Sequence, residues 1–505
     1  MNALVNGQSL SSDAVFHELI QIMDDPVKLA GFLMLLKAKG ETVEEILGIV
    51  RAMRAQMKPF LVEGHVLDIV GTGGDQVGTV NLSTASALLA AKCGAQVVKH
   101  GNRAISSRCG SADVLEALGM DIHRSEMKHN FAFCFAPDYH PKLKEVKKVR
   151  QALKTPTVFN VIGPLLNPAG TDHLLLGVYQ KELVPVIAEV LFKLGTKKSL
   201  VFSGHGIDEL SCIGPTEALL VTSNGIEPLT INPQELGFKA CTLQDLLGKD
   251  ALTNAQLIRN PTPELLDTIV LNVGVALFLY GTVSTIQEGI QIAKRKAMFQ
   301  KGVIAEIKRT SPSKGKIGEI PDVAKRAKDY EAAGAAVVSV LTSERFEGSL
   351  EDLRRVKEAV SIPVLRKDFI VKEEQLKEGT SELILLIVAF LGTRTAEMLQ
   401  AAEKMGYEAI VEIHNEEELV IALEAKAKII GVNQRNLKDF TMHPEVYALI
   451  QKIPDSIVKI AESGVKTKED AQKMFDMGFD AVLVGEALTK NPQLAEVLCS
   501  LKSVV

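Results

Sequence analysis

A glycine-rich segment that ends in an acid is the first part of the chain with a chemical signature. GTGGD (71–75) directly follows HVLDIV, an apolar run that favours a β-strand. Three glycines in four positions let backbone N–H groups approach a phosphate, because no Cβ stands in the way. Gln76 departs from the dinucleotide pattern G-x-G-x-x-G, which needs glycine at that position. The segment NLST (81–84) then opens a predicted helix, whose free N–H groups favour an anion.

Two further segments of the first half carry charge next to predicted strands. KHGN (99–102) ends the second strand and continues as RAISSRCGSAD through Asp113, and Lys and Arg among small residues suit a pyrophosphate. Asp208 and Glu209 lie in SGHGIDELS, where adjacent carboxylates can hold Mg²⁺ beside substrate phosphates. Each segment also has a structural explanation: a tight turn, a solvated basic loop or a pair of surface acids. Their combination favours a phosphate site.

Polar residues also end five apolar segments of the second half, at the carboxyl end of each predicted strand. Glu306 and Lys308 are two residues apart, so they face the same side of one strand. The carboxyl ends of the strands form the face that carries active sites in (βα)8 barrels. A single polar residue there can have a structural role, but polar residues at the ends of five strands favour an active site. Ser463–Gly464 and Gly485–Glu486 follow the last two strands, the usual phosphate site of this fold. The complete polar set is Glu306, Lys308, Lys367, Glu412, Asn433, Arg435 and Glu462.

The elements that must position these residues follow from the pattern of caps and apolar runs. The first 58 residues favour short helices: Asp25–Pro26 begins one, Gly40 ends it, and Thr42 and Glu45 form a capping box for the next. From Val66 strands alternate with helices, which indicates an α/β domain. From Val303 we expect eight βα units and a closed barrel. The strands are predicted at 303–308, 337–342, 363–369, 383–388, 408–413, 429–434, 457–463 and 481–486.

Length and composition exclude several classes of protein. The chain has 505 residues and a net charge of −5, which argues weakly against a nucleic-acid binder. Its six cysteines never form C-x-x-C, as in a reduced intracellular protein. The first ten residues lack the regions of a signal peptide. The most apolar stretch, 383–391, is far shorter than the roughly 20 residues that span a bilayer. We expect a soluble cytoplasmic protein without a nucleic-acid or membrane partner.

Over nearly all of residues 1–298 the chain resembles anthranilate phosphoribosyltransferase. The segments that carry the resemblance are GTGGD, NLST, KHGNRAISSRCGSADVLEALG, VRQALKTPTVFNVIGPLLNPAG and GIDELS. It implies a mainly helical subdomain (1–65), an α/β domain of the nucleoside phosphorylase/phosphoribosyltransferase type (66–298), and a homodimer through the helical subdomain. The family's last helix is absent here or merged into KRKAMFQKG (294–302).

This resemblance also implies a set of binding residues. The glycine loop, the N-x-S-T segment and Lys99 would hold phosphoribosyl pyrophosphate, and no general base is expected. Mg²⁺ would be bound by Ser83, Asp208 and Glu209, and anthranilate by Asn102, His140 and Arg150. The remaining substrate-binding residues expected here are Gly71, Gly73, Gly74, Asp75, Thr79, Asn81, Thr84 and Ser111.

From about Val303 to Leu498 the chain resembles indole-3-glycerol phosphate synthase, so that 299–505 is expected to be a (βα)8 barrel. The segments are AEIKRTSPSKG, VLRKDFI, IVEIH, GVNQRNL, AESGV and VLVGEAL. The resemblance implies that Lys367 is the general acid of ring closure, which precedes loss of the carboxylate and of water. Lys308, Glu306 and Glu412 would assist proton transfer. Substrate-binding residues are expected at Ser311, Asn433, Arg435, Glu462, Ser463, Gly464, Gly485 and Glu486.

Three departures from the barrel family leave alternatives open. The family's N-terminal extension has no counterpart before Val303, TSERFEGS is one residue short, and the crossover VKEEQLKEGTSE is about three residues short. One alternative is therefore an active transferase that carries a catalytically impaired barrel, used for phosphate binding or dimer support. Another is that the first half is a pyrimidine nucleoside phosphorylase, which shares its fold and glycine loop. The two expected reactions are not consecutive, because an isomerase must act between them, and no third domain is predicted.

Overall fold

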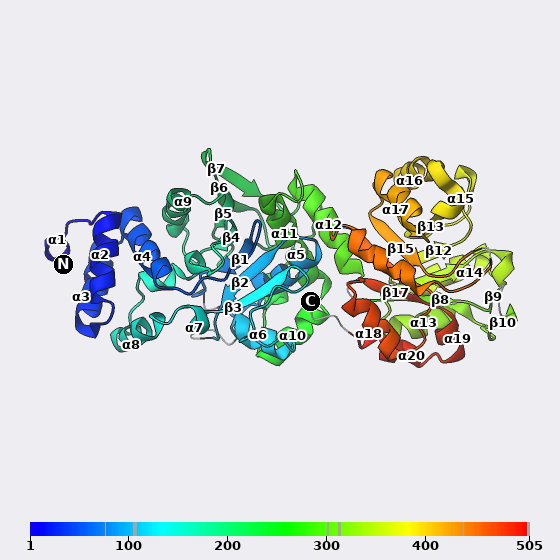
Figure 1. Ribbon diagram of the computed structural model, residues 1–505, viewed down its shortest axis with the longest axis horizontal. Helices are drawn as coiled ribbons and strands as arrows, with labels where there is room; N and C mark the ends of the chain where they lie inside the picture. Colours follow the sequence, from blue (N-terminus) through cyan, green and yellow to red (C-terminus); the bar gives the residue numbers. More distant parts are fainter. Residues whose placement is uncertain (76, 105–108, 300–301, 312–314, 438, 502–505) are drawn as a thin grey trace. The chain divides into compact units, whose positions relative to one another are not determined.

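The computed structural model describes residues 1–75, 77–104, 109–299, 302–311, 315–437 and 439–501 (Figure 1). Gln76, part of RAISSRCG and the end of KRKAMFQKG lie outside the described residues. The chain divides into two compact units, the first holding Met1–Ala293 and the second beginning at Lys294.

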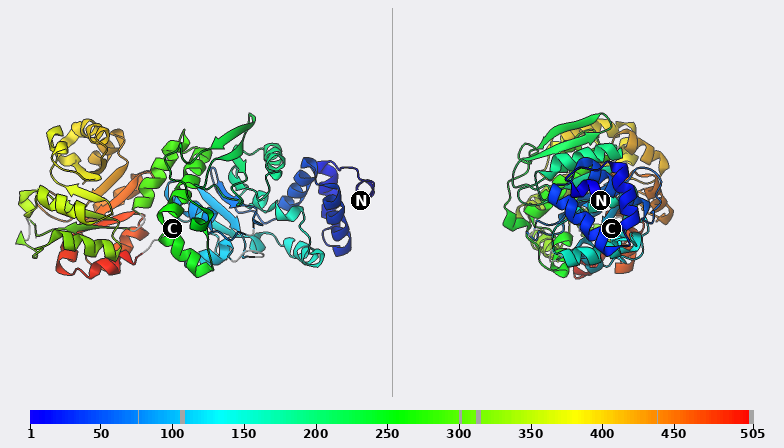
Figure 2. Two further views of the ribbon diagram at one scale, coloured as in Figure 1. Left: turned by 180° about the vertical axis from the view of Figure 1, so that it is seen from behind. Right: turned by 90° about the vertical axis from the view of Figure 1, so that its left-hand side faces the viewer.

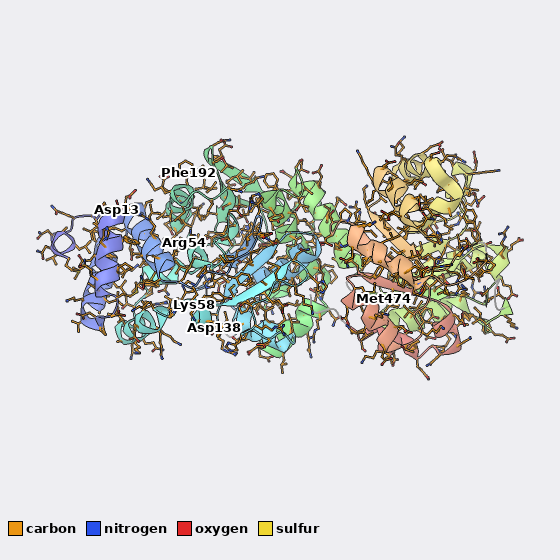
Figure 3. The ribbon with its side chains drawn as sticks, in the orientation of Figure 1. Asp13, Arg54, Lys58, Asp138, Phe192 and Met474 are labelled. Carbon is orange, nitrogen blue, oxygen red and sulfur yellow. The ribbon has the colours of Figure 1, made fainter. Side chains whose placement is uncertain are left out.

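The N-terminal part of the first unit is helical, as the caps predict. Asp25 accepts hydrogen bonds from the N–H groups of Val27 and Lys28 and so begins a helix that ends at Gly40. Thr42 and Glu45 form the predicted capping box. Arg54 donates to the carbonyl oxygen of Leu165 at 2.8 Å and joins the helices to the rest of the unit (Figure 3). These helices are α1 (Asn2–Val5), α2 (Ser12–Ile22), α3 (Pro26–Lys39) and α4 (Val43–Ala55).

A seven-stranded sheet forms the centre of the first unit, in the order β3-β2-β1-β4-β5-β6-β7. The first five strands of that order are parallel, and β6 and β7 add an antiparallel hairpin at one edge. The chain leaves β1 on one side toward β2 and β3 and returns on its other side as β4, so the strand order reverses beside β1. Ligands bind at such a point in open α/β sheets. The strands are β1 (Leu67–Gly71), β2 (Val97–Gly101), β3 (Phe131–Phe135), β4 (His173–Gly177), β5 (Lys198–Phe202), β6 (Thr216–Thr222) and β7 (Gly225–Ile231).

Helices cover both faces of this sheet. The helices α5 and α11 pack together and against β1 and β4, while α9 packs on β5 and β6. Of the described helices, α11 alone is long and apolar enough to cross a membrane, but 67% of its apolar window is buried in the protein. It is therefore a core helix here. The helices are α5 (Leu82–Lys92), α6 (Ser111–Ala117), α7 (Ala136–Tyr139), α8 (Leu143–Leu153), α9 (Leu183–Leu194), α10 (Ala251–Arg259), α11 (Pro263–Tyr280) and α12 (Ile286–Met298), with short 3₁₀ turns η1 (Val158–Asn160), η2 (Gly163–Leu166) and η3 (Leu243–Leu246).

The second unit is a closed barrel of eight parallel strands, which confirms the predicted (βα)8 fold (Figure 2). All eight predicted strands are present: β8 (Val303–Ile307), β11 (Val337–Leu341), β12 (Val364–Lys367), β13 (Leu383–Ile387), β14 (Glu408–Ile413), β15 (Ile429–Asn433), β16 (Val458–Glu462) and β17 (Ala481–Val484). A short antiparallel pair, β9 (Thr310–Ser311) and β10 (Gly315–Lys316), follows β8.

Helices surround the barrel at most crossovers, but the crossover after β12 contains only the 3₁₀ turn η5 (Glu373–Lys377). This is the segment that the sequence marks as short. Arg366 holds it, because its guanidinium donates to the carbonyl oxygen of Gln375 at 2.5 Å and to Glu378 at 3.0 Å. The other elements are α13 (Val323–Ala333), η4 (Glu344–Phe346), α14 (Leu350–Ala359), α15 (Val388–Leu391), η6 (Gly392–Arg394), α16 (Thr395–Lys404), α17 (Glu416–Glu424), η7 (Pro444–Lys452), α18 (Lys468–Asp476), α19 (Glu486–Lys490) and α20 (Leu494–Cys499).

The barrel has an inner and an outer apolar layer. Phe299, fully buried, packs inside with the inward-facing residues of the strands, among them Ile304 and Ile460. The outer layer joins the strands to the helices and includes Met474 of α18, labelled in Figure 3. Lys296, at the end of α12, pairs with Asp480 at 2.8 Å before β17 begins. These two apolar layers hold the strands in position, and the polar residues of the candidate site lie at the carboxyl ends of those strands.

Candidate active sites

The glycine loop after β1 lies directly against the paired acids of the loop after β5. The N–H of Gly73 donates to Asp208 Oδ2 at 2.5 Å, and a Cβ on Gly71 would fall on that same carboxylate oxygen. Gly73 and Gly74 have φ values of +69° and +94°, which disfavour residues with a side chain. The structure thus brings together two segments that lie far apart in the sequence, and each glycine has a steric reason to be there.

The paired acids are buried in a site rich in negative charge. Asp208 and Glu209 are both 8% exposed. Burial and the carboxylate of Asp75 raise the pKa of Asp208 to about 6, and burial together with Asp208 raises that of Glu209 to about 8. Glu209 Oε1 accepts the N–H of Ser83 at 3.1 Å, which places the N-terminus of α5 beside the acids. Clustered carboxylate and hydroxyl oxygens at such a position fit Mg²⁺.

In the described part of the chain, Lys99 is a buried cation that the protein itself supplies to this site. It is 2% exposed, and its ammonium donates to the carbonyl oxygen of Ile69 at 2.7 Å and to Ser83 Oγ at 3.3 Å. Burial lowers the pKa of Lys99, while Asp68, Glu209 and Asp208 oppose that shift. One buried lysine therefore faces several buried acids. A cation and a phosphate that arrive together with the substrate would complete the charge balance.

The remaining pyrophosphate candidates line the same edge of the sheet. Asn81 donates to the carbonyl oxygen of Cys109 at 3.2 Å and accepts from Asn254 at 3.0 Å, so it joins the N-x-S-T segment to the segment that follows the basic loop. A Cβ on Gly101 would fall on Ser111 Oγ. Asn254 was not expected from the sequence, because a single asparagine on a helix has no distinguishing pattern. Thr79 bridges to Leu247, and Thr84 is fully buried in α5.

The three residues expected to contact anthranilate are placed by separate elements. His140 follows α7 and its Nε2 lies 2.9 Å from the carbonyl oxygen of Leu166. Arg150 of α8 donates to Asn160 Oδ1 at 3.2 Å, and Asn102 follows β2. Among the described residues no hydrogen bond joins these three. His100 completes the group, because its ring lies 5.0 Å from that of His140.

The two histidines are neutral at physiological pH. Burial lowers the pKa of His140 to about 4, and burial together with His140 lowers that of His100 to about 3. Burial also lowers the pKa of Arg150, which stays charged because a guanidinium does not lose its proton in proteins. His100 is a residue that the sequence argument missed, although it stands inside the KHGN motif.

In the barrel, Lys367 lies at the centre of the converging charges. Its ammonium lies 3.0 Å from Glu462 Oε2 and 3.4 Å from Glu306 Oε2, and Lys308 lies 3.6 Å from the other oxygen of Glu306. Burial acts to lower the pKa of Lys367, but the carboxylates of Glu306, Glu462 and Glu412 prevail and raise it. The sequence predicts this convergence, and the contacts join the ends of β8, β12 and β16.

Glu412, near the carboxyl end of β14, lies in the same group. Its Oε1 accepts from Asn433 Nδ2 at 3.1 Å, and Asn433 Oδ1 in turn accepts from Ser463 Oγ at 2.9 Å. Burial would raise the pKa of Glu412, but His414 and Lys367 lower it to about 2. Burial and the neighbouring Glu412 raise the pKa of Glu462 to about 8, against the effect of Lys367. Glu412 is thus the more acidic carboxyl of this pair and Glu462 the less acidic one.

Two glycines lie where a side chain would collide with these carboxyl groups. A Cβ on Gly431 would fall on Glu462 Oε1, and one on Gly485 would lie 2.5 Å from Glu306 Oε1. Gly464 has φ +83° in the loop after β16, and Glu486 begins α19 and pairs with Lys490 at 2.7 Å. The N–H of Arg435 donates to Asn433 Oδ1 at 3.0 Å. Ser311 is buried in β9.

A group of three phenylalanines, which the sequence argument did not anticipate, lies beside this charged group. The ring of Phe369 stacks with Phe346 at 6.2 Å and meets the edge of Phe390 at 5.4 Å. The ammonium of Lys308 lies 5.3 Å from the ring centre of Phe346. Phe346 ends η4, Phe369 follows β12 and Phe390 lies in α15, so no local pattern reveals this group. They give the barrel an apolar wall next to its charges, which suits an aromatic substrate.

The fold and these two charged edges define a two-part enzyme: a phosphoribosyltransferase unit and a lyase-type barrel. Three family models match the chain: the glycosyl transferase family helical bundle domain at residues 1–57, the glycosyl transferase family a/b domain at 63–302, and indole-3-glycerol phosphate synthase at 283–501. The chain belongs to the anthranilate phosphoribosyltransferase family in its first part and joins it to an indole-3-glycerol phosphate synthase domain.

Individual relatives agree with the assignment of the first part. The chain is 41% identical over 286 residues to the anthranilate phosphoribosyltransferase of Chlamydia caviae, covering 54% of this chain and 83% of that protein. For the Bacillus cereus protein (strain B4264) the identity is 40% over 315 residues, covering 58% and 91%. The crystal structure of the Thermus thermophilus enzyme matches with a TM-score of 0.55 at 39% identity, over 58% of this chain and 93% of that one. The Saccharomyces cerevisiae enzyme in complex with PRPP and Mg matches with a TM-score of 0.53 at 27% identity, over 58% and 91%.

Proposed function

We propose that the chain catalyses two steps of tryptophan biosynthesis in the cytoplasm. The first unit transfers phosphoribosyl from phosphoribosyl pyrophosphate to anthranilate with Mg²⁺. The barrel converts 1-(2-carboxyphenylamino)-1-deoxyribulose 5-phosphate to indole-3-glycerol phosphate. The observation that carries the second assignment is the contact of Lys367 with both Glu306 and Glu462 inside the barrel.

In the transferase unit the residues bind and align rather than exchange protons. The glycine loop and the N-terminus of α5 offer backbone N–H groups to the diphosphate, and Lys99 adds a buried positive charge. Asp208, Glu209 and Ser83 would hold Mg²⁺, which would supply positive charge to the diphosphate leaving group. The amine of anthranilate attacks C1 of the ribose as the bond from C1 to the diphosphate oxygen breaks, and the proton that the amine loses passes to the released diphosphate or to solvent. The gain in rate comes from this alignment, so no general base is assigned.

The acceptor is held on the other side of the ribose. Arg150 is partly buried and charged, and its guanidinium suits the carboxylate of anthranilate. The neutral rings of His100 and His140 provide a flat, uncharged surface near the aromatic ring. Asn102 would complete the contact from the end of β2. This arrangement favours a planar amine with one negative charge.

In the barrel the charges match a reaction that adds a proton and later removes one. Lys367 stays protonated because three carboxylates surround it, so it can donate to the carbonyl oxygen of the substrate. A bond forms between the ring carbon that bears the carboxylate and that carbonyl carbon, and CO₂ leaves. Lys308 would give the new hydroxyl the second proton that it needs to depart as water. Glu412, ionised at neutral pH, is suited to take the proton that restores the aromatic indole.

Binding of the second substrate uses the rest of the barrel mouth. The loops at Ser463–Gly464 and Gly485–Glu486 would hold the phosphate, and Lys308, Asn433 and Arg435 the polyol and carboxylate. The phenylalanine group would contact the aromatic ring. The short crossover at η5 favours the alternative of an impaired barrel, since less chain covers this side.

We further propose a homodimer formed through the helical part of the first unit. Val5 and Val27 are 66% and 82% exposed on α1 and α3, where apolar side chains would otherwise meet water. Light scattering of the full chain would report the dimer. A monomer at micromolar concentration would contradict it.

The test of the two-step assignment uses the isomerisation step that lies between the two reactions and that this chain is not expected to catalyse. The full chain, supplied with anthranilate, phosphoribosyl pyrophosphate and Mg²⁺, should stop at phosphoribosylanthranilate. Addition of a separate phosphoribosylanthranilate isomerase should then carry the material to indole-3-glycerol phosphate. Formation of that product without isomerase would contradict the assignment, and so would phosphorolysis of thymidine by the first unit.

A further inference from the structure

His414 stands one residue beyond β14 and faces a carboxyl group through each of its ring nitrogens. Its Nε2 lies 3.2 Å from Glu412 Oε1, and its Nδ1 lies 3.0 Å from Glu418 Oε2. The side chain is only 12% exposed. A neutral imidazole carries a proton on one nitrogen and a lone pair on the other. Only the doubly protonated ring can therefore satisfy both carboxylates.

The ring is fixed from the side of α17. Glu418 Oε2 accepts the backbone N–H of His414 at 2.8 Å as well as the ring contact. Asn415 caps α17, accepts the N–H of Glu418 at 2.8 Å and donates to its Oε1 at 3.0 Å. The turn between β14 and α17 thus orients the imidazole toward Glu412.

The other groups around Glu412 do not replace this charge. Asn433 contacts the same oxygen but is neutral. Lys367 acts from β12, where it is shared with Glu306 and Glu462. The neighbouring β13 (LILLI) and α15 (VAFL) contribute apolar side chains. In the described part of the chain, His414 is the cation that contacts Glu412 directly.

We propose that His414 is a positioning residue of the barrel reaction, which keeps Glu412 ionised and oriented through the contact of its Nε2 with that carboxylate. This inference rests on the synthase activity proposed above. It follows from the geometry, and the pKa directions agree with it: burial acts against the charge, yet the two carboxylates raise the pKa of His414 to about 10. Without that charge, Glu412 and Glu462 would compete for one proton, and Glu412 would take up that proton at a higher pH than in the parent protein.

The test is the pH dependence of kcat for indole-3-glycerol phosphate formation by the full chain, measured for His414→Gln. Loss of a charge at this distance should move the acid limb of the profile to higher pH by about one to two units. At neutral pH we expect kcat to fall about tenfold with KM nearly unchanged, because Glu412 stays ionised there but loses the contact that orients it for proton transfer. Glu418→Gln should move the limb in the same direction by less, since it weakens the imidazolium without removing it.

His443→Gln is the matched control, because that histidine pairs with the exposed Glu445 and is itself exposed. It should leave the profile unchanged. A uniform loss of kcat in His414→Gln, with the acid limb where it is in the parent protein, would overturn the inference and leave a structural role. If His414→Gln unfolds the barrel, the same pH profile is measured for Glu418→Gln. An acid limb that does not move in this variant would equally overturn the inference. Absence of synthase activity in the parent protein would instead refute the proposed function.

Discussion

The two units bury acids at the same place, the carboxyl ends of parallel strands, but they balance the charge differently. In the transferase unit Asp68, Asp208 and Glu209 face one buried lysine of the described residues, Lys99. In the barrel the acids lie among Lys367, Lys308 and His414. The first site therefore has raised carboxyl pKa values, which a cation that arrives with the proposed substrate would lower. The barrel carries its own cations, and each of the three is in direct contact with at least one of the acids.

The charge balance of each site matches the chemistry proposed for it. A site that stabilises a departing diphosphate gains from a divalent cation that enters with it. A site that donates and removes protons needs fixed groups whose charges hold one another in place. In both, a glycine lies where a carboxyl group approaches the backbone: Gly71 under Asp208 and Gly431 under Glu462.

Substitution of the central lysine of the barrel should produce the largest separation of the two activities. Lys367→Ala removes the proton donor and should lower indole-3-glycerol phosphate formation by about 10²–10⁴-fold. Anthranilate consumption by the same preparation should not change. Lys404→Ala, at an exposed position on α16, is the control. An equal loss of both activities would point to misfolding instead of chemistry.

The two glycines allow a matched comparison of the sites. Gly71→Ala would displace the Asp208 carboxylate, and Gly431→Ala that of Glu462. Because a shift of about 1 Å in a reacting group can cost about 10²-fold, each variant should lose its own activity by that order. Gly31→Ala, where a Cβ meets only ordinary contacts, should affect neither. If either glycine variant impaired both steps, the units would not be independent.

The smallest of the three effects is expected at the acceptor side of the transferase. Arg150→Ala should weaken the use of anthranilate by about 1.5–3 kcal/mol, the size of one hydrogen bond to a charged group. It should appear as a higher KM for anthranilate, with little change in KM for phosphoribosyl pyrophosphate. Lys147→Ala, exposed on the same helix, is the control. An unchanged KM would remove Arg150 from the acceptor site.

Much of the fold could be predicted because its signals are local. The cap at Asp25, the capping box at Thr42 and the eight apolar strands of the barrel all depend on residues close together in the sequence. The convergence of Lys367 with Glu306 and Glu462 could also be predicted, because parallel strands end at the same edge.

What the sequence did not reveal depends on contacts between distant segments. His100 of β2 meets His140 after α7, Asn254 of α10 reaches Asn81, and Phe369 packs between η4 and α15. None of these contacts has a periodic or spaced signature. His414 is intermediate: it stands two residues after Glu412, but its role requires Glu418 one helical turn further on.

The most direct test of the two-enzyme assignment follows both half-reactions on one preparation of the full chain. One assay supplies anthranilate and phosphoribosyl pyrophosphate, and the other supplies carboxyphenylamino-deoxyribulose phosphate, each with Mg²⁺ and again with excess chelator. We expect both products with Mg²⁺, and with chelator a nearly complete loss of anthranilate consumption while indole-3-glycerol phosphate still forms. Consumption of anthranilate without any indole-3-glycerol phosphate in the second assay would contradict the assignment and leave a transferase joined to an inactive barrel.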